Sequence, residues 1–147
     1  TLISDPATID KELQEADLVI GAVLIPGAAA PKLVREETVK KMKKGAVLVD
    51  VAIDQGGCFE NSKKTSHDDP TFKVHDTLFY CVANMPGAVA NTSTRALSSA
   101  TLPYIRAVAN DSLDAAIKRF PGLEGGVMTR GGRLVSEPVR KAFDWED

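Results

Sequence analysis

The residues best suited to chemistry in this chain are Asp54 and the Gln-Gly-Gly sequence that follows it. They come directly after an apolar run, Ala46–Ile53, in which Asp50 is the only charged residue. A carboxylate just past a strand can accept a proton, orient a water or an amine, or accept a hydrogen bond from a ribose. Paired glycines let the backbone approach a flat ligand closely. The same residues also suit an idle turn in which Asp54 only binds backbone N–H groups, so this motif alone leaves both interpretations open.

Two further loops end in residues that could bind a ligand. The sequence Gly-Ala-Val-Leu-Ile-Pro-Gly at 21–27 could present Val23 and Leu24 to one face of a nucleotide ring. Asn84 offers both a donor and an acceptor, which suits a carboxamide ligand. Each loop by itself is also an ordinary turn. If the preceding strands are parallel, however, all three loops open on one edge of the sheet, where ligands bind in open α/β folds.

The elements that must position these loops follow from the pattern of apolar residues. Strands are predicted over Asp17–Leu24, Ala46–Ile53 and Thr77–Val82, and the second has the composition of a strand buried on both faces. A helix is predicted to start at Ser4-Asp5-Pro6, where Asp5 can cap it. The alternation of helix and strand predicts a parallel α/β sheet with flanking helices.

A second helix is predicted over about Pro31–Lys44 and is ended by Gly45. Its apolar residues Leu33, Val34, Val39 and Met42 can face the sheet. The lysines at 40, 41, 43 and 44 are read as the solvated end of this helix, where cations suit the dipole. A loop is expected between the second and third strands.

The character of the chain changes after Pro86, which predicts a division into segments 1–85 and 86–147. The second segment is predicted to be mainly helical. Its expected elements are a helix over Thr92–Asn110 bent at Pro103, a helix over Ser112–Arg119 capped by Asp111, a hairpin over Val127–Val135 and a helix over Glu137–Phe143.

Composition sets broad limits. The 147 residues are 44% hydrophobic and 26% charged, as in ordinary globular proteins. A net charge of −2 and a pI near 5.7 give no reason to expect nucleic acid or an anionic membrane as a partner. No stretch has the length of a membrane span, and no signal peptide is visible. Because the chain starts at Thr1 rather than at Met, we expect it to be cut from something longer.

The cysteines and histidines suggest no separate site. Cys58 and Cys81 do not make a disulfide framework, and reduced, inert thiols in a cytoplasmic protein fit them best. His67 and His75 have no spacing typical of zinc ligands, so no metal site is predicted and surface or structural roles are favoured. The Gly-x-Gly-x-x-Gly fingerprint of a dinucleotide fold is absent. If this is a Rossmann-type domain, only its second half is present.

Four long segments resemble alanine dehydrogenase, in its carboxyl-terminal part. They read ADLVIGAVLIPG at 16–27, PKLV at 31–34, GAVLVDVAIDQGGCFE at 45–60 and VHDTLFYCVANMPGAV at 74–89. The resemblance continues through residues 92–104 and is weaker from Asp111 onward. It implies the second half of a Rossmann-type NAD domain over 1–85, and a helical segment of the substrate domain over 86–147.

The resemblance also implies reversible oxidation of L-alanine by NAD to pyruvate and ammonia, in a protein that is typically a homo-hexamer. Asp54 is then catalytic, beside a histidine that lies in the amino-terminal domain with the lysine and arginine that hold the substrate. None of those three is in this chain, so the chain alone is expected to be inactive. Lys63 stands where an arginine is expected near the cofactor. It keeps the positive charge but cannot form the bidentate hydrogen bonds of a guanidinium group. The implied cofactor contacts are Ser4, Val23, Leu24, Val51, Ala52, Ile53, Asp54, Lys63, Val82, Ala83, Asn84 and Met85.

Two alternatives remain. The NAD-binding part of proton-translocating transhydrogenase shares this architecture, but has a Gly-Gly-Asn-Cys-Glu type of sequence where this chain has Gly-Gly-Cys-Phe-Glu at 56–60. The chain could also be a nucleotide-binding or assembly module without catalysis of its own.

Overall fold

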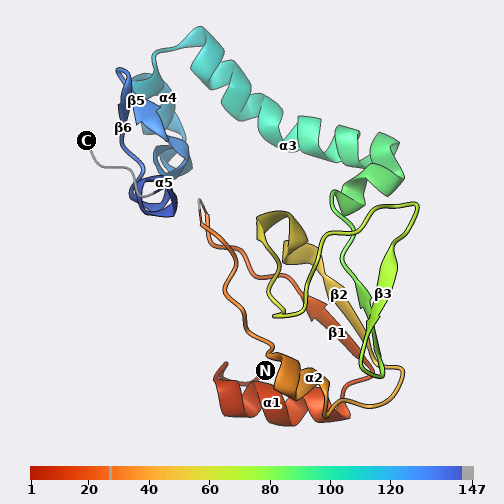
Figure 1. Cartoon of the computed structure of the whole chain (residues 1–147). Coiled ribbons are helices and arrows are strands. Elements are labelled where there is room, and N and C mark those ends of the chain that lie inside the picture. The colour runs from red at the N-terminus through yellow and green to blue at the C-terminus, as the bar shows by residue number, and fades with distance from the viewer. Residues whose placement is uncertain (27, 144–147) are drawn as a thin grey trace. The chain divides into compact units, whose positions relative to one another are not determined.

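The computed structural model describes residues 1–26 and 28–143. Contacts divide the chain into two compact units, unit 1 over Thr1–Met85 and unit 2 over Pro86–Asp147. Figure 1 shows that the sheet lies in unit 1, whereas helices and one small hairpin make up unit 2.

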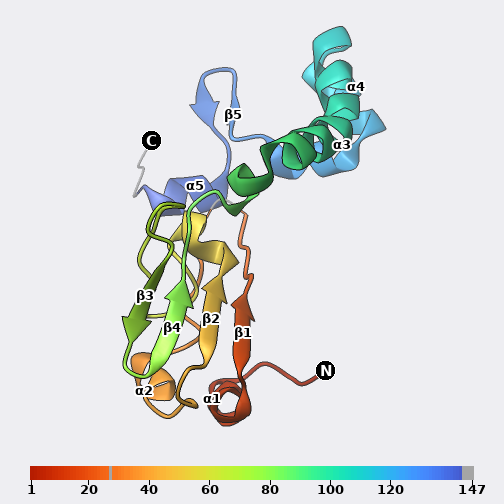
Figure 2. The same cartoon turned by 90° about the vertical axis from the view of Figure 1, so that its right-hand side faces the viewer.

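The sheet of unit 1 has four strands in the order β1-β2-β4-β3. Strands β1 (Leu18–Gly21), β2 (Val47–Asp50) and β4 (Thr77–Tyr80) are parallel, as the sequence predicted. Their arrows point the same way in Figure 2. Each strand is shorter than its predicted range. The carboxyl ends of all three strands therefore meet at one edge of the sheet.

Strand β3 (Thr71–Val74) was not predicted, and the expectation of a plain loop before the third strand was wrong. It pairs antiparallel with β4 through a tight turn at His75-Asp76, where His75 has a left-handed φ of 52°. Its four residues follow Pro70 and alternate between exposed and half-buried, which is typical of an edge strand. So short an alternation carries little signal in the sequence.

Helix α1 (Pro6–Glu15) begins as predicted, because both Ala7 N and Thr8 N donate to the Asp5 carboxylate over 3.0 Å. The second predicted helix was wrong in extent, since α2 covers only Glu36–Val39. The residues before it are extended instead. Val34 makes an isolated parallel bridge to Phe59, and this pairing overrides helix propensity.

One face of the sheet carries the core. Leu48 and Phe79 are fully buried there against Val39 and Met42, and Phe59 meets Phe79 edge to face with ring centroids 6.0 Å apart. Ile9 and Leu13 of α1 pack against the same cluster, whereas Leu33, expected there too, is 39% exposed.

The opposite face of the sheet is bare. Leu18 and Ile20 are 57% and 63% exposed, and the side chains of Val47 and Val49 beside them are only half-buried. The prediction that the run Ala46–Ile53 is buried on both faces was therefore wrong. Instead of continuing as a strand, its last residues turn into a 3₁₀ helix, η1 (Val51–Gln55).

Unit 2 has the predicted mainly helical character. Asp111 is not the cap of the second helix as expected, because Ser112 Oγ accepts the hydrogen bond from Ala115 N at 3.3 Å. Within the described residues, no helix is both long and apolar enough to cross a membrane. The elements are η2 (Met85–Val89), α3 (Ala90–Asn110, with Pro103 inside it), α4 (Leu113–Arg119), η3 (Pro121–Gly126), β5 (Thr129–Arg130), β6 (Arg133–Leu134) and α5 (Glu137–Ala142).

Candidate functional site

Asp54 lies on η1, directly past the carboxyl end of β2, and its side chain is exposed. Asn84, which follows β4, donates its backbone N–H to Asp54 Oδ2 over 3.2 Å. Asn84 takes a left-handed φ of 54°, a conformation that asparagine tolerates better than most residues. The structure thus brings together two of the three loops predicted to share an edge of the sheet.

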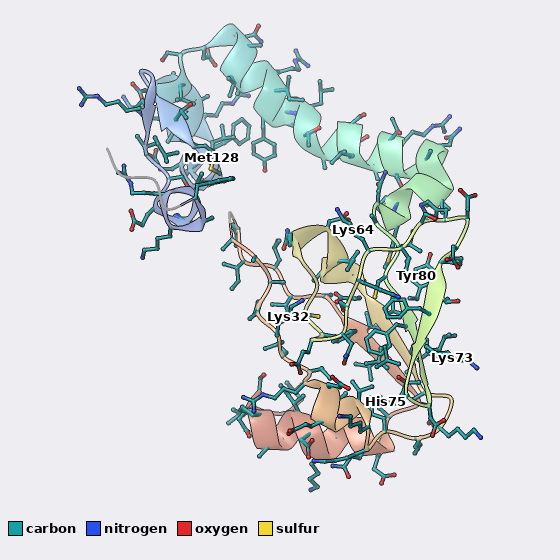
Figure 3. The ribbon with its side chains drawn as sticks, in the orientation of Figure 1. Lys32, Lys64, Lys73, His75, Tyr80 and Met128 are labelled. Atoms are coloured by element: carbon teal, nitrogen blue, oxygen red, sulfur yellow. The ribbon has the colours of Figure 1, made fainter. Side chains whose placement is uncertain are left out.

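Two nitrogen-bearing side chains, Lys64 and His67, join this pair, and no local pattern in the sequence indicates either. Lys64 Nζ lies 4.0 Å from Asp54 Oδ1, and His67 Nε2 lies 3.3 Å from the Asn84 carbonyl oxygen (Lys64 is labelled in Figure 3). A β-bridge between Thr65 and Val82 places the segment that carries Lys64 and His67 beside the end of β4. This contact is consistent with the surface or structural role predicted for His67, and it places His67 next to the candidate site.

The Asp54 loop rests on a buried carboxylate. Asp50, at the end of β2, is fully buried and accepts hydrogen bonds from Cys58 N at 2.9 Å and Ser62 Oγ at 2.5 Å. Gly57 is held against it with a φ of 76°, and a Cβ there would lie 2.6 Å from Asp50 Oδ2. Only glycine fits both the dihedral angle and the space.

Both cysteines are free and buried. Burial, together with the smaller effect of the nearby Asp50 carboxylate, raises the pKa of Cys58 to about 11. Burial likewise raises the pKa of Cys81. Since the thiolate is the nucleophile, these raised values leave both side chains protonated and inert at neutral pH.

The other residues implied as cofactor contacts differ in what they can offer. Leu24 and Val51 expose 63% and 48% of their surface at the carboxyl edge of the sheet, so they can pack against a flat ring. Ala52, Ile53 and Val82 are buried, which leaves only their backbone for contact. Half-buried positions are Val23, Ala83 and Met85.

Two residues implied as cofactor contacts, Lys63 and Ser4, have no described interaction with Asp54 or Asn84. The Lys63 ammonium sits over the ring of Phe72, 4.4 Å from its centroid, and so already has a partner. Ser4 is exposed just before the Asp5 cap. In the part of the chain that the structure describes, no hydrogen bond joins Ser4 to Asp54 or Asn84.

The groups that meet at this edge of the sheet suit a dinucleotide better than a metal ion. An exposed carboxylate, the Asn84 amide and exposed apolar side chains meet at one edge, and a Cβ at Gly56 would meet nothing within 4 Å. That combination suits a flat ring with polar substituents. Across residues 1–26 and 28–143, no group of three or more His, Cys, Asp and Glu side chains could hold a metal ion.

Comparison with known families supports the same interpretation. Residues 1–137 match the family described as "Alanine dehydrogenase/PNT, C-terminal domain". The chain belongs to this family. Among the curated relatives of this AlaDH/PNT domain are alanine dehydrogenases of Mycolicibacterium smegmatis, Mycobacterium tuberculosis and Halomonas elongata. They are 57%, 56% and 49% identical over 98%, 95% and 99% of the chain. The chain spans only 38–39% of their length.

Solved structures agree with the family assignment. An L-alanine dehydrogenase superposes with a TM-score of 0.73 at 46% identity, over 96% of this chain and 39% of that one. A transhydrogenase from Sinorhizobium meliloti gives a TM-score of 0.66 at 24% identity, over 90% of this chain and 36% of that one, and this likeness concerns the fold alone. The predicted fold class, a Rossmann-type parallel sheet with flanking helices, is confirmed.

Proposed function

We propose that this chain is the carboxyl-terminal part of an NAD-dependent alanine dehydrogenase that interconverts L-alanine with pyruvate and ammonia. The observation that carries the proposal is the identity of 49–57% with alanine dehydrogenases over nearly the whole chain. The site agrees with it, because Asp54 and Asn84 meet at the sheet edge where open α/β folds bind ligands.

In this proposal the edge of the sheet holds the cofactor. Leu24 and Val51 offer exposed apolar surface to a ring, and Asn84 offers an amide side chain to a carboxamide. When bound, NAD supplies the hydride acceptor. Contacts through Ser4 and Lys63 are the least supported by the geometry, since neither is joined to Asp54 by a described interaction and Lys63 already packs on Phe72.

Asp54 is the proposed catalytic residue. Oxidation of an amine gives an imine that water must attack, and an exposed carboxylate can orient that water and accept its proton. The Asn84 N–H fixes one carboxylate oxygen, and Lys64 lies 4.0 Å from the other. At that distance the exposed lysine contributes little energy.

The remaining catalytic groups belong to another part of the enzyme in this proposal. The sheet supports such a division, because the side chains of Leu18 and Ile20 lie exposed on an edge strand. Parallel sheets are normally covered on both faces. We therefore propose that unit 1 is the second half of an NAD-binding domain, and that unit 2 belongs to the substrate domain. On this basis the 147-residue chain alone has no turnover.

The proposal is tested with Asp54→Asn in the full-length enzyme. We expect a loss of alanine-dependent NADH formation of at least about 100-fold, the lower limit for a general base. The Kd for NAD should stay within about tenfold, or 1.4 kcal/mol. Asp76→Asn, at the hairpin before β4, is the matched control and should retain full activity. Normal turnover by Asp54→Asn would mean that Asp54 is only a turn residue.

The substrate and the assembly are tested separately. Lack of alanine-dependent NADH formation by the wild-type enzyme would refute the dehydrogenase proposal, and would favour a transhydrogenase or a non-catalytic nucleotide-binding module. We further propose a cytoplasmic homo-hexamer, as in the family that the sequence resembles. Light scattering of the full-length enzyme measures its assembly, and cell fractionation its compartment.

A further inference from the structure

The turn after Asp54 has all its carbonyl groups bound from one side. Segment 30–34, which lies extended beside the turn, supplies the donors for the four consecutive carbonyl oxygens of residues 55–58. The bonds run from Ala30 N to Gln55 O (2.9 Å), from Lys32 Nζ to Gly56 O (2.6 Å) and Gly57 O (2.9 Å), and from Leu33 N to Cys58 O (2.8 Å).

The N–H groups of residues 56–59 donate to acceptors at the carboxyl end of β2 and in η1. Two of them bind carbonyl groups of η1, and two bind the buried Asp50 carboxylate. The bonds run from Gly56 N to Ile53 O (3.1 Å), Gly57 N to Ala52 O (3.0 Å), and Cys58 N and Phe59 N to Asp50 Oδ2 (2.9 and 3.4 Å). The backbone of the turn is thus held on both sides.

Lys32 supplies the only side-chain donor among these hydrogen bonds to the carbonyl groups of residues 55–58. Its ammonium group binds the carbonyl oxygens of Gly56 and Gly57, whose φ values of 92° and 76° are open to few residues other than glycine. Without Lys32 these two peptide groups keep, among the described bonds, only their N–H bonds, from Gly57 N to Ala52 O and from Cys58 N to Asp50 Oδ2. Two consecutive glycines have wide conformational freedom, so a turn held on one side alone is less rigid. Figure 3 shows the Lys32 side chain in unit 1, on the segment that leads from β1 to α2.

Asp54 depends on that turn for its position. Its own side chain is exposed and has only the 3.2 Å bond from Asn84 N and the distant Lys64 ammonium among its described polar contacts. The glycines begin two residues after it. A displacement of about 1 Å at a reacting group can cost about 100-fold in rate, so the stiffness of the turn sets how well Asp54 is placed.

We propose that Lys32 is a positioning residue for Asp54, which acts by fixing the carbonyl groups of Gly56 and Gly57 without touching the substrate. The inference rests on the proposed function, because Asp54 must act in the reaction. Lys32 is exposed, and its removal leaves the buried core of unit 1 in place.

The test is Lys32→Met in the full-length enzyme. We expect kcat for alanine oxidation to fall about tenfold, part of the loss that a 1 Å displacement can cause. The Kd for NAD should stay within about twofold, since no cofactor contact is removed. Lys32→Arg, which can also donate to two carbonyl oxygens, should recover most of the rate. Lys44→Met changes an exposed lysine at the amino end of β2 and should behave as wild type.

A double-variant cycle separates positioning from general stability. In an Asp54→Asn background, assayed at high enzyme concentration, Lys32→Met should change the residual rate by less than about twofold, because sites that act through one another are not additive. Equal tenfold losses in both backgrounds would overturn the inference, as would wild-type kcat for Lys32→Met. If Lys32→Met does not fold, a failure of Lys32→Arg to keep kcat overturns it. An enzyme without alanine turnover, or an active Asp54→Asn, instead refutes the proposed function.

Discussion

The buried Asp50 carboxylate gives the sharpest prediction about stability. Replacing Asp50 with Ala removes the acceptor for Cys58 N at 2.9 Å and for Ser62 Oγ at 2.5 Å, and the weaker one for Phe59 N at 3.4 Å. The side chain of Asp50 is 0% exposed, so water does not replace the lost acceptor. A buried donor without a partner costs about 1–3 kcal/mol.

Two such donors give an expected loss of about 2–6 kcal/mol for Asp50→Ala. Since whole domains have free energies of unfolding of about 5–15 kcal/mol, this loss is a large fraction of the total. Asp50→Asn keeps one oxygen for Cys58 N and should lose only about 1–2 kcal/mol. We therefore expect the free energy of unfolding to be lowest for Asp50→Ala, intermediate for Asp50→Asn and highest for the wild type.

Urea unfolding followed by far-UV circular dichroism measures these differences. Asp54→Ala is the matched control, because this exposed carboxylate has one long hydrogen bond and its loss should stay within about 0.5 kcal/mol. An Asp50→Ala variant as stable as the control would refute the reasoning. It would mean that the turn finds other acceptors at no cost.

Two further predictions concern the packing under the site. Gly21→Ala should destabilise unit 1 by about 1–3 kcal/mol, because the new Cβ would lie 2.3 Å from Cys58 Sγ and 2.7 Å from Phe59 Cζ. Adding Cys58→Ala should recover part of this loss. If the two losses measured by urea unfolding are additive instead, the explanation is contradicted. Cys58, with its pKa raised from 9.0 to about 11, should resist iodoacetamide at pH 8 until urea unfolds the chain, as mass spectrometry can check. By linkage, neutral Cys58 stabilises the fold fully below pH 9, and this contribution is lost as the pH rises through about 11, whereas Cys58→Ala should lack that alkaline loss.

Local patterns were enough to predict the elements that place the site. The apolar runs predicted β1, β2 and β4 as parallel strands, and Asp5-Pro6 predicted the start of α1. Once the strands are parallel, Asp54 and Asn84 must come to the same edge, and they do. These predictions succeeded because each rests on contacts close in sequence or on the direction of strands.

The failures depend on pairings far apart in the chain. Residues 31–35 belong to the predicted helix Pro31–Lys44, but they are held extended by bonds to residues 58–60, more than twenty positions away. Lys64 and His67 reach the site only because Thr65 pairs with Val82. In the sequence, Asp50 stands out only as the lone charge in an apolar run. Its hydrogen-bonding role becomes visible when Cys58 and Ser62 fold back over it.

The bare face of the sheet has a consequence for producing the protein. Leu18 and Ile20 lie side by side with Val47 and Val49 on this face, and β1, which carries Leu18 and Ile20, is an edge strand with unpaired backbone groups. Exposed apolar edge strands tend to pair with other chains. We expect the 147-residue chain, expressed by itself, to self-associate and to bind chaperones during synthesis. Soluble expression should improve when the chain is produced together with the other half of the proposed NAD-binding domain.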